Sequence, residues 1–279
     1  MIAFEQASNL RVLMIGDAIV DKYSFVKVTG KSAKDAILAS TISREETYEG
    51  GIRAAAKHIE QLVHTVDVYS GNNIVTAQKF VEDAHYRKVF SVNRQDNISL
   101  YRSDLDIAAY DLVIVIDYGH GTMTKAMIER VSSEAKFLAV NAQTNGTNYG
   151  FNLITKYPRA DYVVLDELEA RLAARMQDAP IENVIRALEY ANIVVTCGKA
   201  GAIGYDGTTF ARSPAMTETV VDTLGAGDAF LAVTAPFAYL GASMLDLLRL
   251  GNAAGAVKVG IVGHKSSVTR EALEKQLNG

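Results

Sequence analysis

Short apolar runs rich in β-branched residues alternate with longer stretches of helical character, and this alternation constrains the fold more than any other feature. Six runs have the composition of strands buried on both faces: residues 11–16, 65–70, 111–117, 136–141, 161–166 and 192–198. Four stretches between them have helical character: residues 51–62, 124–135, 167–176 and 181–190. The alternation predicts an α/β fold, a doubly wound and mostly parallel sheet sandwiched by helices.

Two regions break this alternation. Residues 22–49 and 85–102 are polar, prone to β structure and without helical period. Because the chain returns promptly to the main pattern after each, they predict a small β lid over the open edge of the core, within a single domain of residues 1–279. A lid rich in β-formers also makes a homodimer, paired lid to lid, an expectation.

The charge and hydropathy of the chain limit the classes of partner that it is expected to bind. A net charge of −4 with no basic run argues against nucleic acid, so a small-molecule partner is expected. The first residues lack the basic region of a signal peptide, which predicts a cytoplasmic location. Residues 229–245 carry no charge, but the stretch contains Pro236 and is short for a membrane span. It predicts a buried helix pair and no association with a membrane.

Acids and amides follow the ends of several predicted strands, where a doubly wound sheet binds its ligands. They include Asp17, Asp21, Asp117, Asn141 and Gln143. Such side chains accept hydrogen bonds from hydroxyl groups, which favours a polyol or sugar. Alternatively, Asp17 and Asp21 cap strand ends, and Asp117 is structural.

The stretch DTLGAGDAF, residues 222–230, places glycines directly before a predicted helix. Gly225, Ala226 and Gly227 let a ligand approach the backbone closely, and the N–H groups of a first helical turn bind anions such as phosphate. Asp228 beside them suits a base that takes a proton from a hydroxyl while a phosphoryl group develops charge. The spacing therefore fits phosphoryl transfer. Alternatively, the glycines only form a turn and Asp228 caps the helix.

DTLGAGDAF resembles the C-terminal signature of the ribokinase-like (phosphofructokinase-B type) carbohydrate kinases. YEGGIRAAAKHI, residues 48–59, resembles their N-terminal double-glycine motif, and the resemblance continues in order over nearly the whole chain. VLMIGDAIVDKY, DYGHG and NAQTN are most similar to the kinase domain of the heptose-phosphate kinases of ADP-heptose synthesis. The resemblance implies a parallel α/β sandwich with a β lid, ATP as the phosphoryl donor, and Asp228 as the base.

The resemblance also implies roles for residues that bind the acceptor and the metal. Asp17 and Asp21 would hold sugar hydroxyls, and the backbone of Gly50 and Gly51 would lie against the sugar. Asp117 and Asn141, by their position after strand ends, are also expected to face the acceptor. A second set would bind ions: Asp166 and Glu169 would organise Mg²⁺ through water, and Asp222 and Thr223 a monovalent cation such as K⁺.

For the nucleotide, the resemblance implies a loop containing Thr196, Gly198 and Gly201, with Asn252 beside the adenine. ATP phosphates bind a hard cation that keeps most of its waters, which supports Mg²⁺ independently.

The chain departs from the family pattern at two positions. Ala54 stands where most members have a sugar-binding Asn, and Asp166 replaces the usual Asn near the metal. Lys31 and Lys34 in the predicted lid would suit an acceptor that already carries a phosphate, or alternatively form a solvated basic flap. Arg53 is either a substrate clamp or part of a helix surface.

Three functions are consistent with these features. The first is an ATP-dependent kinase of a sugar or sugar phosphate, whose product a separate nucleotidyltransferase could use. The second is a nucleoside or vitamin-alcohol kinase of the same fold, with stacking by Tyr23, Phe25 and Tyr48. The third is a non-catalytic homologue that binds a sugar or nucleotide.

Overall fold

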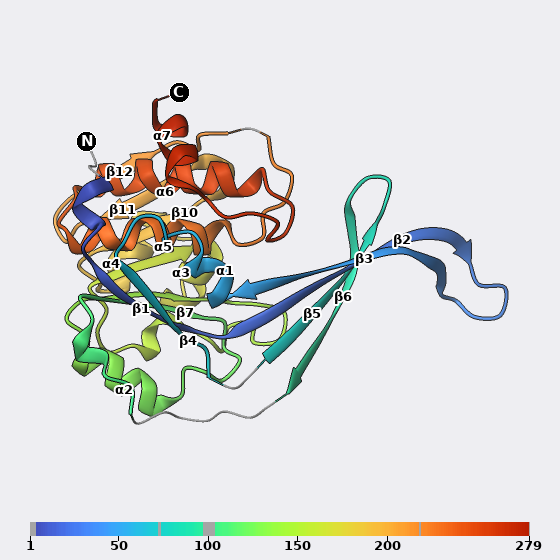
Figure 1. Cartoon of the computed structure of the whole chain (residues 1–279), viewed down its shortest axis with the longest axis horizontal. Coiled ribbons are helices and arrows are strands. Elements are labelled where there is room, and N and C mark those ends of the chain that lie inside the picture. The colour runs from blue at the N-terminus through green and yellow to red at the C-terminus, as the bar shows by residue number, and fades with distance from the viewer. Residues whose placement is uncertain (1–3, 72–73, 97–103, 218, 279) are drawn as a thin grey trace.

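An eight-stranded sheet forms the centre of the molecule in the computed structural model, which describes residues 4–71, 74–96, 104–217 and 219–278 (Figure 1). Its order is β12-β11-β10-β9-β8-β7-β1-β4. The strands are β1 (Arg11–Gly16), β4 (Thr65–Tyr69), β7 (Leu112–Asp117), β8 (Leu138–Ala142), β9 (Tyr162–Asp166), β10 (Ile193–Thr196), β11 (Ala202–Tyr205) and β12 (Phe210–Ser213). Neighbours pair in parallel from β4 to β10, while β11 and β12 are antiparallel. The predicted α/β sheet is confirmed; β11 and β12 were not predicted.

Helices cover both faces of this sheet. On one face lie α1 (Ile52–Ala56), α5 (Ala226–Tyr239), α6 (Met244–Val259) and α7 (Arg270–Asn278). On the other lie α2 (Lys125–Glu134), α3 (Glu167–Ala174) and α4 (Ile181–Ala187). Alternate strand residues serve the two cores: Val12 and Met14 of β1 pack on the α5 side, and Leu13 and Ile15 on the α2 side. Short 3-10 helices occur at Phe4–Ala7, Ile107–Ala109, Ile154–Lys156 and Gly198–Ala200.

Two helical predictions have different outcomes. Residues 229–245 form most of α5 and the start of α6, which pack against each other in the core as expected. Residues 51–62 were expected to be one helix, but α1 ends at Ala56. The N–H groups of His58 and Ile59 donate to the carbonyls three residues earlier, so the chain after Ala56 forms tighter turns in place of an α-helix. Within the described ranges, every helix is too short or too polar to cross a bilayer.

A second, four-stranded sheet forms the lid and extends from one side of the α/β body (Figure 1). Its order is β3-β2-β5-β6, with β2 (Ala18–Lys31), β3 (Leu38–Gly51), β5 (Ile74–Glu82) and β6 (Arg87–Asp96). The predicted segments contribute β6 and most of β2 and β3, although residues 97–102 lie outside the described chain. Strand β5 was not predicted. Only Asp17 separates β1 from β2, so the lid begins directly at the carboxyl edge of the main sheet.

Candidate active site

Helix α5 begins at the edge where the parallel strands end. Its N-cap, Gly225, has φ +74°, a left-handed conformation that glycine adopts without strain. The Ala226 N–H bonds to the Thr223 carbonyl. The N–H groups of Gly227 and Asp228 have no hydrogen-bond partner among the described residues. The first turn of α5 therefore presents free donors and the positive end of a helix dipole, the arrangement that binds anions.

Asp228 lies on this first turn and is buried, with 7% of its surface exposed. Its carboxylate accepts hydrogen bonds from the Tyr118 hydroxyl (2.8 Å) and the Gln143 side-chain amide (2.5 Å). Burial raises the pKa of Asp228, while these two hydrogen bonds and the charge of His264 act against the rise. A carboxylate with a raised pKa, held by two donors, is suited to accept a proton.

Asp21 of β2 approaches the same region from the lid. Its carboxylate forms ion pairs with Lys79 of β5 and with His264, whose Nε2 lies 3.3 Å from Oδ2. Burial works to raise the pKa of Asp21, but His264 and Lys79 together bring it below its usual range. A Cβ built on Gly225 would lie 3.2 Å from His264 Cε1, so this histidine stands between Asp21 and the start of α5.

The double glycine permits a close crossing between lid and core. A Cβ on Gly50 would lie 2.1 Å from Asp21 Oδ2, and one on Gly51, with φ +59°, would lie 2.3 Å from the Asp17 carbonyl oxygen. Both contacts are far inside van der Waals distance. The two glycines are thus required by the packing of β3 on β2, whatever they contact in a substrate.

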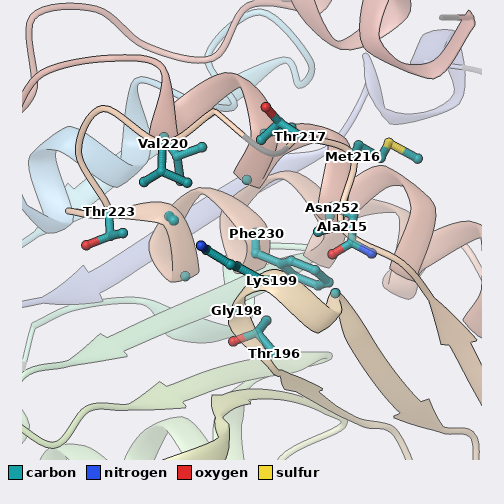
Figure 2. A pocket seen from close by; sticks show the side chains of 17 residues that line it. Thr196, Gly198, Lys199, Ala215, Met216, Thr217, Val220, Thr223, Phe230 and Asn252 are labelled. Carbon is teal, nitrogen blue, oxygen red and sulfur yellow. The ribbon is translucent and has the colours of Figure 1, made fainter.

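On the other side of the α5 N-terminus lies a cavity of about 330 Å³ (Figure 2). It brings together every residue predicted for the nucleotide, namely Thr196, Gly198, Gly201 and Asn252, with Thr223, Ala226 and Gly227. Apolar side chains supply much of the remaining wall: Ala215, Met216, Val220, Phe230, Ala256 and Val259. An apolar cavity that ends on free helix N–H groups fits a planar base followed by phosphates.

Helix α6 keeps this cavity open. A Cβ on Gly255 would meet nothing within 4 Å, so this glycine leaves space at the wall. Asn252 uses its amide to hold the carbonyls of Ser213 and Pro214, both at 3.0 Å, so it fixes the chain that borders the cavity. Sequence reasoning missed Lys199, whose side chain extends across the cavity toward Thr223 (Figure 2).

Asp166 and Glu169 form a capping box at the start of α3. The Asp166 carboxylate accepts the Glu169 N–H at 2.7 Å, and the Glu169 carboxylate accepts the Asp166 N–H at 2.9 Å. Burial, followed by the charge of Asp166, raises the pKa of Glu169 to about 8. Asp166 is exposed, and its second carboxylate oxygen accepts no hydrogen bond from the described residues. In the described part of the chain, no three or more His, Cys, Asp or Glu residues are grouped to hold a metal.

Asp222 is fully engaged with protein groups. Its carboxylate accepts Lys88 Nζ (2.8 Å), the Tyr23 hydroxyl (3.1 Å) and the N–H groups of Leu224 and Gly263. Burial works to raise the pKa of Asp222, but Lys88 and the Gly263 N–H bring it down to about 2. The carboxylate thus ties two lid strands to the turn before α5. This placement disagrees with its expected role as a ligand of a monovalent cation.

Lys258 of α6 lies beneath the same turn and is 0% exposed. Its Nζ donates to the carbonyls of Leu224 (2.7 Å) and Gly263 (2.8 Å). Burial lowers the pKa of Lys258, while Asp222 and Asp228 act in the opposite direction. Sequence reasoning missed this residue, although a single charge within the otherwise apolar segment GAVKVG is a recognisable signal.

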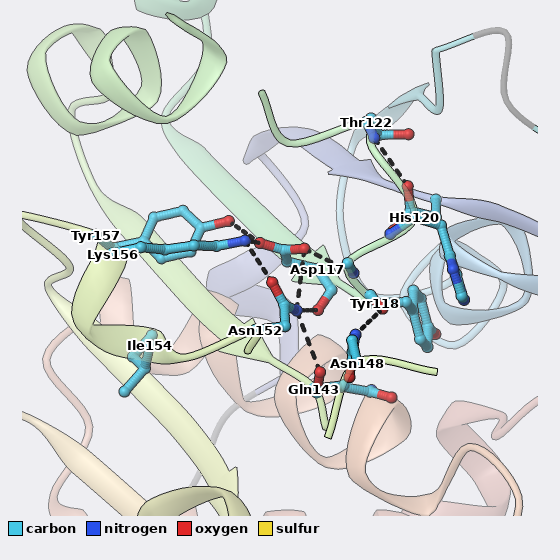
Figure 3. Close-up of polar contacts among 12 residues, drawn as sticks. Asp117, Tyr118, His120, Thr122, Gln143, Asn148, Asn152, Ile154, Lys156 and Tyr157 are labelled. Carbon is cyan, nitrogen blue, oxygen red and sulfur yellow. Dashed lines mark hydrogen bonds and ion pairs between the residues drawn. The ribbon is translucent and has the colours of Figure 1, made fainter. Parts of the chain in front are cut away.

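Two acids predicted to face the sugar are occupied by structural contacts. Asp17 is 0% exposed and accepts the N–H groups of His120 and Thr122, which supports the alternative of strand-end capping. Asp117 lies in a buried network and accepts from the Tyr157 hydroxyl (2.6 Å) and the Lys156 ammonium (2.5 Å) (Figure 3). Both therefore shape the loop that carries Tyr118, and neither presents a free carboxylate to a ligand.

Three other residues predicted to bind the acceptor substrate do not come together in the structure. Asn141 is buried and donates to the Val164 carbonyl and to Glu169, while its Oδ1 has no partner. Arg53 is exposed on α1 and pairs with Glu49, in line with the helix-surface alternative. Lys31 ends β2, ten residues beyond Asp21, which is about 30 Å along an extended strand. Lys31 and its neighbour Lys34 are exposed and far from the α5 N-terminus of their own chain.

The aromatic residues considered for base stacking are mostly covered. Tyr23 and Phe25 are buried in the small core of the lid, where their rings stack at 6.3 Å. The Tyr23 hydroxyl is also bonded to Asp222. Tyr48 packs edge-on against Tyr23 and is part-buried. Stacking on Tyr23 or Phe25 is thus already satisfied within the protein.

Comparison with known proteins shows relatives over nearly the whole chain. A family model described as pfkB family carbohydrate kinase matches residues 76–270. The bifunctional protein HldE of Geotalea uraniireducens is 24% identical over 307 residues, 93% of this chain and 61% of the relative. The chain thus spans less than two thirds of that protein. The D-beta-D-heptose 7-phosphate kinase of Bordetella bronchiseptica is 23% identical over 300 residues, 93% of this chain and 94% of the relative.

Solved structures share the fold at lower identity. The ribokinase of Thermotoga maritima has a TM-score of 0.76 at 16% identity, covering 97% of this chain and 100% of that one. The Arabidopsis thaliana ribokinase complexed with ribose and ATP has a TM-score of 0.69 at 17% identity, with 98% and 100% covered. Phosphofructokinase-2 of Escherichia coli in complex with potassium has a TM-score of 0.69 at 12% identity, with 96% and 98% covered.

Proposed function

The chain belongs to the pfkB family of carbohydrate kinases, and we propose that it transfers the γ-phosphoryl group of ATP to a hydroxyl of a sugar or sugar phosphate. Membership of the family implies a phosphotransferase. The single observation that carries the proposal is the α5 N-terminus, where unpaired N–H groups of Gly227 and Asp228 lie beside the Asp228 carboxylate. A cytoplasmic location is part of the proposal, because the enzyme would need ATP as its substrate.

Asp228 is the proposed general base. It takes the proton of the acceptor hydroxyl as the oxygen attacks the γ-phosphorus, and ADP leaves. Tyr118 and Gln143 orient its carboxylate. They also stabilise its ionised form, because each donates a hydrogen bond to it.

The backbone of the first α5 turn is the proposed anion hole. Free N–H groups at Gly227 and Asp228 stabilise negative charge on the migrating phosphoryl group. The helix already holds these groups in position, so they need not reorient during the reaction. Lys199, whose side chain extends toward Thr223 in the cavity, would add a positive charge near the phosphates (Figure 2). The cavity would hold the adenine ring of ATP against Phe230 and α6.

The acids at the start of α3 fit magnesium held mainly by ATP phosphates and water. Such an ion needs only one or two carboxylates, and Asp166 offers an exposed oxygen while buried Glu169 holds it in place. When bound, Mg²⁺ would supply positive charge that neutralises the triphosphate. Asp166 and Glu169 are proposed as its protein partners, through water.

A heptose-phosphate-like acceptor is favoured, because a similar heptose 7-phosphate kinase matches this chain over nearly its full length. Asp21, held by Lys79 and His264, would accept its hydroxyls beside Gly50. Lys79 is the lid lysine that pairs with Asp21. A separate nucleotidyltransferase is proposed to use the product.

A homodimer through the lid is also part of the proposal. The lid exposes apolar side chains at Val28, Leu38 and Ile42 on the far parts of β2 and β3, at Ile37 in the loop between them, and at Val89, Phe90 and Val92 on β6. Exposed apolar residues on β-strands favour pairing with another copy.

An acceptor panel tests the proposed activity. Purified protein receives Mg·ATP with heptose 7-phosphates, hexoses, hexose phosphates, nucleosides or a hydroxymethylpyrimidine, and ADP release is followed. We expect turnover with a sugar or sugar phosphate. Asp228→Asn should lower kcat about 100-fold or more, because it removes the base. The variant should still bind ATP, since its backbone N–H groups and the cavity are unchanged.

Two results would contradict the proposal. Turnover confined to nucleosides or the pyrimidine alcohol would favour the second kinase class. No turnover with any acceptor, despite ATP binding, would favour a non-catalytic homologue.

A further inference from the structure

A buried ammonium group occupies the turn that leads into α5. Lys258 is 0% exposed, and its Nζ bonds to two backbone carbonyls, those of Leu224 and Gly263. Transfer of a lysine from water into a protein interior is costly unless its charge is compensated. Here two carbonyl dipoles and the nearby carboxylates of Asp222 and Asp228 compensate it.

The family resemblance places a monovalent cation at Asp222 and Thr223, but the Asp222 carboxylate and the nearby Leu224 carbonyl are already bonded within the protein. Backbone carbonyls are the ligands by which proteins hold K⁺. The Leu224 carbonyl, two residues beyond Asp222, accepts from Lys258. The Asp222 carboxylate accepts from Lys88, Tyr23 and two backbone N–H groups. The donor set therefore does not fit a bound K⁺.

We propose that the Lys258 ammonium stands in for a monovalent cation: it holds the turn before α5 in place and makes the protein independent of K⁺. The lysine stem packs directly under this turn, because a Cβ on Gly225 would lie 3.3 Å from Lys258 Cε. The bond from Nζ to the Leu224 carbonyl holds the start of this turn. Lys258 thus acts as a positioning residue for the anion-binding turn.

This inference rests on the proposed kinase function only for the anion-binding role of the turn before α5. Its test does not require measurement of kinase activity. Thermal unfolding is measured in equal concentrations of KCl and tetramethylammonium chloride, a cation too large for a carbonyl site. Four proteins are compared: the unmodified chain, Lys258→Ala, Lys258→Met and Leu250→Ala. Leu250 is a buried residue of the same helix, so Leu250→Ala controls for a cavity without carbonyl ligands.

We expect the unmodified chain to melt at the same temperature in both salts. Lys258→Ala should melt lower in tetramethylammonium chloride and recover part of the loss in KCl, because K⁺ binds the vacated carbonyls of the folded state only. Lys258→Met, which fills the space without a charge, should be destabilised and show no recovery. Leu250→Ala should also be destabilised equally in both salts.

Either of two outcomes would overturn the inference. One is stabilisation of the unmodified chain by KCl over tetramethylammonium chloride, since a K⁺ site would then exist beside Lys258. The other is a Lys258→Ala protein that folds but ignores K⁺. If that variant does not fold, the comparison of salts on the unmodified chain decides. Absence of kinase activity would leave these melting temperatures unaffected, so the two proposals fail separately.

Discussion

At the scale of single residues, the site depends on which polar atoms are left free. Asp17 and Asp117 are typical of ligand-binding acids by their position after strands, yet backbone N–H groups, a tyrosine and a lysine occupy them. Asp228 also accepts hydrogen bonds from side chains, those of Tyr118 and Gln143. It differs by its place on the first turn of α5, beside the unpaired N–H groups of Gly227 and Asp228.

Tyr118→Phe should shift the pH dependence of turnover. The lost hydrogen bond stabilises ionised Asp228, so its removal raises the pKa of Asp228 further. Because the base works only when ionised, the acidic limb of the kcat profile should move to higher pH. Tyr162→Phe is the matched control: it removes another buried hydroxyl, bonded to Thr234 in the core. An unchanged acidic limb in Tyr118→Phe would count against Asp228 as the base.

Two alanine substitutions in the glycine turn should have opposite effects on stability. Gly225 has φ +74°, so Gly225→Ala should destabilise the fold by about 1–2 kcal/mol. Gly227 is helical and a Cβ there meets nothing within 4 Å, so Gly227→Ala should stabilise by about 0.5–1 kcal/mol. The new methyl would, however, enter the cavity and raise the KM for ATP. Chemical denaturation and initial rates measure the two effects; unchanged ATP affinity in Gly227→Ala would place the phosphates elsewhere.

At the scale of elements, the chain after α1 is held to the segment before α7 by one buried histidine. His58 Nδ1 accepts the Val268 N–H at 2.9 Å, so His58 must be neutral at that nitrogen. Burial, followed by the charges of Lys258 and His264, lowers the pKa of His58 to about 3.

Stability should consequently fall in acid through His58. The unfolded chain protonates this histidine below about pH 6.5 while the folded chain does not. Its contribution is therefore complete above pH 6.5 and decreases as the pH falls toward 3. The melting temperature of the unmodified chain should drop more between pH 7.5 and 5.5 than that of His58→Gln. His64→Gln, which changes an exposed histidine, should behave like the unmodified chain. Equal drops in all three would show that His58 is not responsible.

At the scale of the whole molecule, two sheets share one functional edge. The lid reaches the α5 turn through Lys88 and Tyr23, which bind Asp222, and through Asp21, which pairs with His264. Movement of the lid would therefore be transmitted to the turn before α5. The far parts of β2 and β3 serve no such contact in their own chain, and they carry the exposed apolar residues.

A dimer through these residues should be sensitive to charge. Leu38 and Ile42 are 64% and 56% exposed on β3, so their replacement by glutamate has little effect on the folding of one chain. We expect Leu38→Glu/Ile42→Glu to sediment as a monomer at concentrations where the unmodified chain is a dimer. Val68→Glu, an exposed position on the edge strand β4, should leave the dimer intact. A monomeric unmodified chain would refute the dimer.

The sequence by itself determined the kinds of elements and the position of the glycine turn before α5, because hydrophobic period and glycine spacing are local properties. The strands at 11–16 and 112–117 and the helix after Gly225 were predicted for this reason. Strand β5 was missed because it pairs with the distant strand β2. Strands β11 and β12 pair locally with each other, but each has only four residues and so carries little periodic signal.

Only the tertiary structure decided which side chains meet. Lys258, His264 and Lys79 reach the site from segments with no recognised motif. The Asp117 carboxylate accepts a hydrogen bond from Tyr157, forty residues away. Such partners depend on how helices and sheets pack, and packing brings together residues whose separation along the chain carries no periodic signal. The role of each acid followed from its neighbours in space.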